Sequence, residues 1–307
     1  MSNQQALVIF PGALGDFICF VPALRELARR AGATPTLLVK ESLAPLVREA
    51  GIAAPRAIEG REGSWLFSAD PPPEAREFFG RFAVVECFTG HGVPEVEANL
   101  RRSGAAHVGI HPFRPPSPEH IAAHFLRCIG AATTPLPEVH LELPRARASA
   151  PRVPLNRKPA LVVHPGSGGV VKRWSREGFA RIASTWARER GDAVVILGPA
   201  ESAESPFWEA SAVMTAVGLD LPGLASALAG AELYLGNDSG ASHLAGALGM
   251  RGIVVFGPTA PELWRPLSSR LSVFRPKPWT RLDEAAPEEV IRSLDRELTR
   301  AHARTSP

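Results

Sequence analysis

The chain has 307 residues, of which 45% are hydrophobic and 21% are charged, and its formal net charge at pH 7 is +3. This length predicts two domains, and the composition is that of an ordinary globular protein. The net charge is too small to indicate a nucleic-acid partner, and we expect none. The cysteines Cys19, Cys87 and Cys128 are widely spaced, which argues against a disulfide framework or a zinc site and predicts a reducing, cytoplasmic location.

The first half of the chain predicts an α/β domain. The expected elements are a buried strand at 6–10, a loop at 11–16, a helix at 21–30 and further strands at 36–39, 83–88 and 106–110. Short unbroken apolar runs separated by helical stretches are typical of a parallel sheet that is covered on both faces.

The second half repeats this organisation after a segment of different composition. Residues 144–159 are rich in proline and arginine, show no periodicity and are predicted to be a linker. The elements expected beyond it are strands at 160–163, 193–197, 233–236 and 252–257, a helix at 177–190 and an amphipathic helix at 285–304. No apolar stretch approaches the length of a membrane span.

The loop after the first strand reads Pro-Gly-Ala-Leu-Gly-Asp and ends at Asp16. Its glycines, Gly12 and Gly15, would let the backbone approach a ligand closely. Asp16 has two interpretations, the N-cap residue of the following helix or a general base at the mouth of a site. The loop is not a dinucleotide fingerprint, because the pattern G-x-G-x-x-G is absent, and this counts against an NAD-dependent dehydrogenase.

A second glycine-rich loop follows the strand at 160–163 and runs from His164 to Trp174. Ser167 and the glycines can donate hydrogen bonds, and Lys172 can neutralise a phosphate in a chain that has few lysines. The alternative is a glycine-rich turn with a solvated lysine. His164 is equally consistent with a histidine at a strand end that is bonded to backbone, and Trp174 is expected in the core.

The stretch from residue 233 to 249 is the most informative part of the chain. An apolar strand ends at Gly236, the capping residues Asn237, Asp238 and Ser239 follow, and a helix of small residues carries His243. The first turn of such a helix favours an anion, and in open α/β sheets ligands bind at the carboxyl ends of the strands. The alternative is a well-capped helix with no ligand.

The order of these motifs resembles glycosyltransferase family 9, the ADP-heptose:lipopolysaccharide heptosyltransferases and their relatives. The motifs that carry the resemblance are Gly-Ala-Leu-Gly-Asp ending at Asp16, His-Pro-Gly-Ser-Gly beginning at His164, Gly-Asn-Asp-Ser-Gly beginning at Gly236, Phe-Gly-Pro-Thr beginning at Phe256, and Trp-Arg-Pro beginning at Trp264. The resemblance covers residues 6–300. It implies an α/β protein of the GT-B fold, in which two Rossmann-like domains face each other across a cleft.

The implied domains are an acceptor domain at 1–150, a nucleotide-sugar domain at 151–284 and a final helix at 285–307 that crosses back to the first domain. The implied catalytic base is Asp16. The implied donor-binding residues are Ser167, Gly168, Lys172, Asp238, Ser239, Gly240 and His243, with Glu201 or Glu204 at the ribose. The candidate acceptor-binding residues are Gly12, Gly15, Arg61, Arg101 and Arg114, with Arg102 beside them; each arginine also has the alternative of a solvated surface charge.

The expected reaction is inverting transfer of a sugar, a heptose from an ADP-heptose-like donor, to a hydroxyl of a glycan or lipopolysaccharide-core acceptor. We expect no cofactor and no metal, because no Asp-x-Asp motif occurs. We also expect a cytoplasmic monomer, with peripheral contact at the inner face of the membrane. The alternatives are a nucleotide-sugar epimerase or hydrolase on the same fold, and a non-catalytic protein that binds a nucleotide-sugar.

Overall fold

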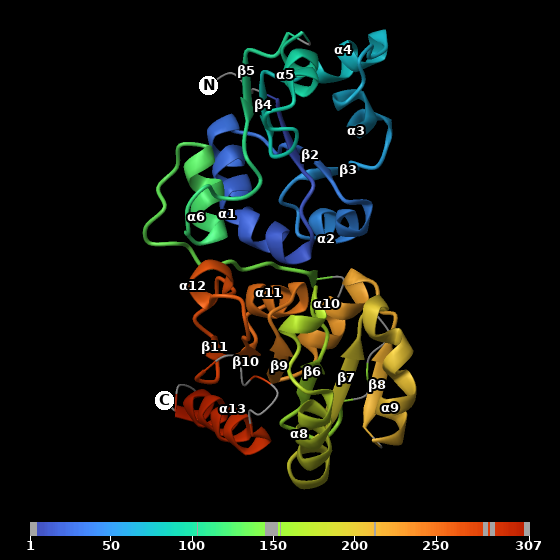
Figure 1. Cartoon of the computed structure of the whole chain (residues 1–307), viewed down its shortest axis with the longest axis vertical. Helices are drawn as coiled ribbons and strands as arrows, with labels where there is room; N and C mark the ends of the chain where they lie inside the picture. Colours follow the sequence, from blue (N-terminus) through green and yellow to red (C-terminus); the bar gives the residue numbers. More distant parts are fainter. Residues whose placement is uncertain are drawn as a thin grey trace. The chain divides into compact units, whose positions relative to one another are not determined.

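The computed structural model describes residues 5–102, 104–144, 153, 155–211, 213–278, 282 and 286–303. The chain divides into two compact units, Met1–Pro137 and Glu138–Pro307, and each is built on its own sheet (Figure 1). The boundary lies earlier than the predicted boundary at 150. The reason is that residues 138–143 join the second unit: the N–H groups of Val139 and Leu141 donate to the carbonyls of Leu267 and Ala247. Most of the predicted linker at 144–159 lies outside the described residues.

The first unit has a five-stranded sheet in the order β3-β2-β1-β4-β5, and every pair is parallel. The strands are β1 (Ala6–Phe10), β2 (Thr36–Val39), β3 (Ala54–Ala57), β4 (Val84–Cys87) and β5 (His107–Ile110). The helices are α1 (Leu14–Ala31), α2 (Ala44–Glu49), α3 (Arg61–Leu66), α4 (Pro73–Phe79), α5 (Pro94–Arg101) and α6 (Ile121–Cys128), with a 3₁₀ turn η1 at Glu41–Leu43.

Alternation along the strands divides the core of the first unit into two parts. Leu7 and Ile9 of β1 pack with side chains of α3, α4 and α5 on one face. Phe10 points to the other face, where it stacks on Phe20 of α1 with ring centroids 4.3 Å apart and meets Phe125 of α6 edge-on. Helices α1 and α6 lie side by side there (Figure 1).

The second unit has a six-stranded parallel sheet in the order β11-β10-β9-β6-β7-β8. The strands are β6 (Leu161–His164), β7 (Ala193–Leu197), β8 (Met214–Val217), β9 (Leu233–Asn237), β10 (Arg251–Val255) and β11 (Leu271–Phe274). The helices are α8 (Arg176–Glu189), α9 (Ser205–Ala210), α10 (Leu221–Ala229), α11 (Gly240–Ala247), α12 (Pro261–Trp264) and α13 (Pro287–Ala303), with 3₁₀ turns η2 (Val170–Lys172) and η3 (Pro199–Glu204).

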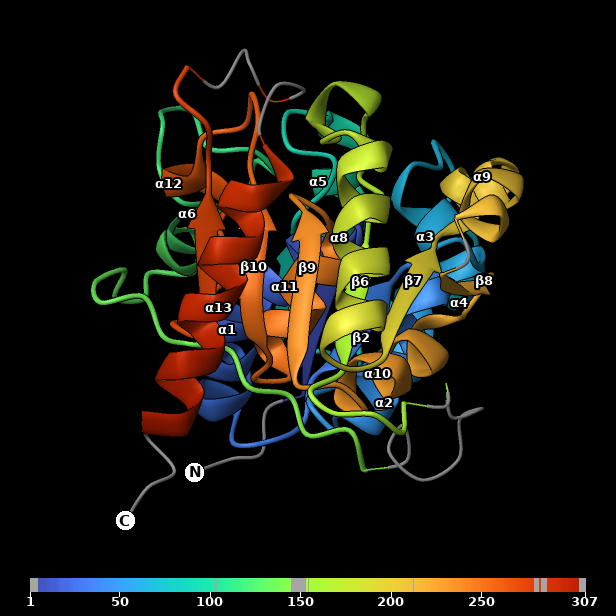
Figure 2. The same ribbon diagram turned by 90° about the horizontal axis from the view of Figure 1, so that it is seen from below.

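The final helix α13 packs against the second unit, and its predicted return to the first unit stays a prediction. It lies beside α8 over the strands of the second sheet (Figure 2). Its Val290 and Leu294 are buried with Trp186 of α8 in one hydrophobic core. Trp174 belongs to the same core, as predicted. Among the described residues, no helix combines the length and the apolar character needed to cross a bilayer.

Candidate active site

Asp16 lies in the first turn of α1, which begins at Leu14 and not, as predicted, near residue 21. The helix starts early because Ala13 has the extended backbone of an N-cap residue, and the carboxylate of Asp16 accepts a hydrogen bond from the Ala13 N–H at 3.4 Å. The N-cap residue is therefore Ala13 and not Asp16, which is the third helical residue and accepts from the N–H of the N-cap. The carboxylate stays partly accessible, since 14% of the side chain is exposed.

Arg114 is brought to Asp16 from the segment after β5. Its Nη1 donates to Asp16 Oδ1 at 2.8 Å, and its guanidinium lies over the ring of Phe113 at 4.7 Å. The two residues meet because β1 and β5 belong to one parallel sheet, whose strands all end at the same edge. The structure thus joins the predicted base to one of the predicted arginines.

Two residues that the sequence analysis did not select anchor the segment that carries Arg114. Glu86 of β4 is 6% exposed, and one of its carboxylate oxygens lies 2.6 Å from His111 Nε2. His124 Nε2 lies 2.7 Å from the Pro112 carbonyl, which fixes the next residue of the segment. A carboxylate inside an apolar strand was the available sequence signal, because a buried charge requires a partner.

The pair of Glu86 and His111 predicts a stability that depends on pH. Burial opposes the charge on His111, but hydrogen bonds to Cys128 and Glu86 outweigh it and raise the pKa of His111 from 6.5 to about 9. A raised folded-state pKa contributes stability that is complete below pH 6.5 and lost as the pH rises through 9. We expect urea unfolding to show a loss of up to about 3 kcal/mol between these values.

The variant His111→Gln should flatten this dependence. His107→Gln is the matched control, because His107 Nε2 also lies near Glu86, at 3.2 Å, but its side chain is 61% exposed. An unchanged pH dependence in His111→Gln would show that another group is responsible.

Gly12 of the first loop has a packing role. A Cβ at Gly12 would lie 2.4 Å from the Phe10 ring and 2.9 Å from Asp16 Cβ, so the close approach of the loop to Phe10 requires glycine. Gly15 lies in the first turn of α1. The proposed ligand contacts of both glycines remain predictions.

The other predicted arginines contact their own helices. Arg61 lies over the ring of Trp65 at 5.5 Å and is 73% exposed. Arg101 is paired with Glu97 at 2.8 Å, and Arg102 donates to Asn99 at 2.6 Å. Within the described residues, only Arg114 among the predicted arginines contacts Asp16.

In the second unit, Lys172 and Asp238 form an ion pair. Lys172 Nζ donates to Asp238 Oδ2 at 3.0 Å, and the carboxylate is 7% exposed while the lysine is 36% exposed. Lys172 lies at the end of η2 in the loop that follows β6, and Asp238 directly follows β9, the neighbouring strand in the sheet. The two separate sequence motifs therefore form one site at the carboxyl edge of this sheet.

The remaining residues of the β6 loop are arranged around its backbone. The Ser167 hydroxyl donates to the Gly169 carbonyl at 2.7 Å, and the space beside Gly168 is open. Burial lowers the pKa of His164 to about 4, so its ring is neutral at pH 7 and is not a phosphate-binding cation.

The N-terminus of α11 contains a buried hydroxyl group without a partner. Ser239 is the N-cap residue, and within the described residues its buried Oγ has no partner in good hydrogen-bond geometry, although it lies close enough to the Tyr234 hydroxyl to oppose the rise that burial causes in the pKa of that group. The nearby hydroxyl of Tyr234 is engaged with Ser242 Oγ at 2.9 Å. Gly240 begins the helix, and His243 is buried within it. A helix N-terminus with an unused buried donor is suited to an anionic ligand.

Asn237, which the sequence predicts only as a capping residue, connects the two motifs. Its Nδ2 donates to the Pro165 carbonyl at 2.7 Å, and its Oδ1 accepts from the Trp174 N–H at 3.0 Å. The side chain is fully buried. One amide thus holds both ends of the β6 loop against the end of β9.

Glu201 and Glu204 are both held by Arg173, whose Nη2 and Nη1 donate to them at 2.6 and 3.1 Å. Glu201 is 4% exposed, and its carboxylate occupies the space that a Cβ at Gly166 or Gly198 would need. Glu201 therefore fastens the β6 loop to η3. A contact of either carboxylate with a ribose remains a prediction.

The described residues include no group of three or more histidine, cysteine, aspartate or glutamate side chains placed to hold a metal ion.

Comparison with known proteins supports the interpretation of these two units. Residues 119–288, more than half of the chain, match the sequence model of glycosyltransferase family 9 (heptosyltransferase). No curated protein matches the sequence significantly.

Several solved structures share the fold. A glycosyl transferase of family 9 from Veillonella parvula superposes with a TM-score of 0.78 at 19% identity, covering 98% of this chain and 99% of that one. The E. coli ADP-heptose lipopolysaccharide heptosyltransferase II superposes with a TM-score of 0.75 at 18% sequence identity, and the match covers 97% of this chain and 99% of that one. The structure of E. coli heptosyltransferase WaaC with ADP superposes with a TM-score of 0.68 at 20% sequence identity, and the match covers 95% of this chain and 99% of that one. The predicted GT-B fold, with two parallel α/β domains, is confirmed, and the chain belongs to glycosyltransferase family 9, the heptosyltransferase family.

Proposed function

We propose that this glycosyltransferase transfers a heptose from an ADP-heptose-like donor to a hydroxyl of a glycan or lipopolysaccharide-core acceptor, with inversion at the anomeric carbon. The observation that carries the proposal is the site in the second unit, where Lys172 and Asp238 lie beside the partnerless Ser239 hydroxyl at the first turn of α11. Solved structures of a similar protein, E. coli heptosyltransferase WaaC, contain ADP and ADP-2-deoxy-2-fluoro heptose.

The donor diphosphate would bind where positive charge and free donors converge. Lys172 supplies a cation, the Ser239 hydroxyl and the first N–H groups of α11 supply donors, and Ser167 is placed on the facing loop. These groups would also stabilise the charge that grows on the leaving diphosphate, an effect worth several kcal/mol in a site arranged in advance. With this role filled by protein groups, we propose that transfer needs no metal and no cofactor.

The acceptor hydroxyl would lose its proton to Asp16. Its oxygen forms a bond to the anomeric carbon as the bond from that carbon to the diphosphate oxygen breaks, and the nucleoside diphosphate leaves with the electron pair. Arg114 and the Ala13 N–H orient the two carboxylate oxygens of Asp16. We further propose that the protein acts as a cytoplasmic monomer at the inner face of the membrane, with no nucleic-acid partner.

A screen of nucleoside diphosphates tests the donor. We expect ADP to stabilise the protein by about 2.7 kcal/mol at one hundred times its Kd, with smaller effects of UDP and GDP. Thermal unfolding with each nucleotide, followed by calorimetric titration, measures the difference. A response to UDP or GDP that equals the ADP response would contradict an adenine nucleotide as the donor base.

An assay of ADP-sugar turnover with and without acceptor distinguishes the alternative functions. A hydrolase or epimerase consumes or converts the nucleotide-sugar without an acceptor, and a non-catalytic protein binds it without turnover. Incubation of the ADP-sugar with and without acceptor, followed by chromatography of the products, separates these outcomes. We expect ADP release to depend on the acceptor, because the nucleophile in the proposed reaction is its hydroxyl.

A further inference from the structure

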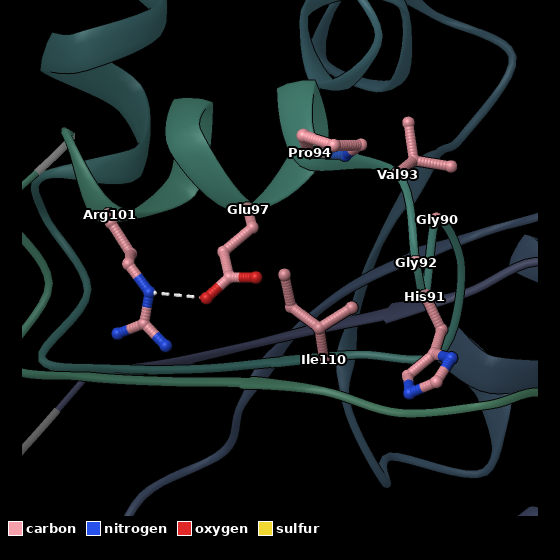
Figure 3. A pocket seen from close by; sticks show the side chains of 8 residues that line it. All are labelled: Gly90, His91, Gly92, Val93, Pro94, Glu97, Arg101 and Ile110. Carbon is pink, nitrogen blue, oxygen red and sulfur yellow. Dashed lines mark hydrogen bonds and ion pairs between the residues drawn. The ribbon is translucent and has the colours of Figure 1, made fainter.

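A second site in the first unit is a cavity of about 420 Å³ beside α5 (Figure 3). Glu97 and Arg101 project from successive turns of α5 toward Ile110 at the end of β5, and His91 lies across from them on the loop after β4. Its volume falls within the range of natural small-ligand pockets. The proposed base Asp16 does not line this cavity, so the proposed catalytic site gives the cavity no role.

The loop of the cavity is shaped by glycine. Gly90 has a φ of +66°, and a Cβ there would lie 2.6 Å from the side chain of Val96 in α5. Gly92 has a φ of +79°, and the Val93 N–H closes the turn on the Gly90 carbonyl at 2.9 Å. Both glycines adopt the left-handed backbone that other residues rarely take. The turn therefore packs tightly on α5 and places His91 at the rim.

The chemistry of the lining suits a sugar. Glu97 can accept hydrogen bonds from hydroxyl groups, Arg101 can donate them and His91 can do either. Val93 and Ile110 add apolar surface against which the C–H groups of a pyranose ring can pack. Glu97 and Arg101 are paired at 2.8 Å, so together they offer a neutral ligand both an acceptor and a donor.

The register of the sheet relates the cavity to Asp16. Ile9 of β1 is level with Cys87 of β4, and Cys87 is level with Ile110 of β5. Two strand spacings of about 4.8 Å place Ile110 about 10 Å from Ile9 at the carboxyl edge of the sheet. Helix α5 covers one face of the sheet and α1, which carries Asp16 in its first turn, covers the other, so a ligand that reaches both must cross this edge. An acceptor of several sugar residues can span this distance.

We propose that the cavity at Glu97, Arg101 and His91 binds a sugar residue of the acceptor other than the residue that receives the transferred group. The proposal rests on the proposed function for the identity of the ligand as acceptor. It makes the cavity a determinant of acceptor choice, because a correctly placed second sugar aligns the reactive hydroxyl with Asp16.

The test uses the full chain labelled with ¹³C at histidine Cε1, with the His91 signal assigned by its loss in His91→Gln. The probes are the methyl glycosides of mannose, glucose and N-acetylglucosamine, with inorganic phosphate as the anionic probe. We expect at least one glycoside to shift the His91 signal saturably and phosphate to leave it unchanged. Glu97→Gln and Arg101→Gln should each raise the glycoside Kd about tenfold or more.

Glu77→Gln is the matched control, because Glu77 of α4 and Arg81, two residues beyond its end, form an exposed ion pair with the same sequence spacing. It should leave the glycoside Kd unchanged. The proposal is overturned if no glycoside shifts the His91 signal, if the pocket variants bind as tightly as the control, or if phosphate binds in place of sugar.

Titration of the same sample with ADP separates the two proposals. ADP binding without any glycoside response overturns the acceptor pocket alone. A glycoside response without ADP binding overturns the proposed donor and leaves the sugar pocket standing.

Discussion

Asp16→Asn is expected to lower the rate of sugar transfer by about 10²–10⁴-fold and to leave the affinity for ADP unchanged. The amide keeps the size of the side chain and can still accept a hydrogen bond from the Ala13 N–H, but it cannot take a proton from the acceptor hydroxyl. The loss should therefore appear in kcat. Release of ADP under saturating donor and acceptor measures it, and calorimetry measures ADP binding.

Glu74→Gln is the control for this experiment, because Glu74 is an exposed carboxylate in the first turn of α4 in the same unit. Folding should survive Asp16→Asn, since the lost ion pair with Arg114 is half-exposed on the arginine side and such pairs contribute about 0–1 kcal/mol. A variant that transfers sugar at the normal rate would remove Asp16 as the base.

Lys172→Ala is expected to raise the Kd for ADP about 10- to 100-fold, because it removes a charge-assisted contact of roughly 1.5–3 kcal/mol with the diphosphate. The change also leaves the buried carboxylate of Asp238 without its partner. We therefore expect the free energy of unfolding of the free protein to fall by about 1–3 kcal/mol. Calorimetric titration and urea unfolding measure the two effects.

A second substitution separates these effects. Adding Asp238→Asn to Lys172→Ala should recover part of the stability, because the unpaired buried charge is gone, but should not recover ADP affinity. Lys158→Ala is the matched control, since Lys158 forms an exposed pair with Glu232 at 2.9 Å in the same unit. Normal ADP affinity in Lys172→Ala would refute the proposed diphosphate site.

Local patterns in the sequence were sufficient for the elements that build the two sheets. The strands expected at 6–10, 36–39 and 193–197 occur with those bounds as β1, β2 and β7. β1 and β7 are unbroken apolar runs that are buried on both faces, so a strand can be predicted there from consecutive residues alone. The start of α1 was less predictable, because Ala13 caps the helix through its backbone and has no capping side chain.

Contacts between side chains far apart in the sequence could not be predicted from local patterns. Arg114 meets Asp16 across 98 positions, and Lys172 meets Asp238 across 66. Each residue type was recognisable as a candidate, but no spacing rule connects residues so far apart. The contacts arise because the order of strands in each parallel sheet brings separate loops to one edge.

The sequence by itself determined the α/β class, the glycine-rich loops after the strands and the family, because each of these depends on short runs of neighbouring residues. Only the tertiary structure decided that Arg114 contacts Asp16, that Arg173 holds Glu201 and Glu204, and that α13 packs on the second unit. Those outcomes depend on strand order and on the packing of whole helices. A buried charged side chain needs a partner, and the fold as a whole decides which residue lies close enough to pair with it.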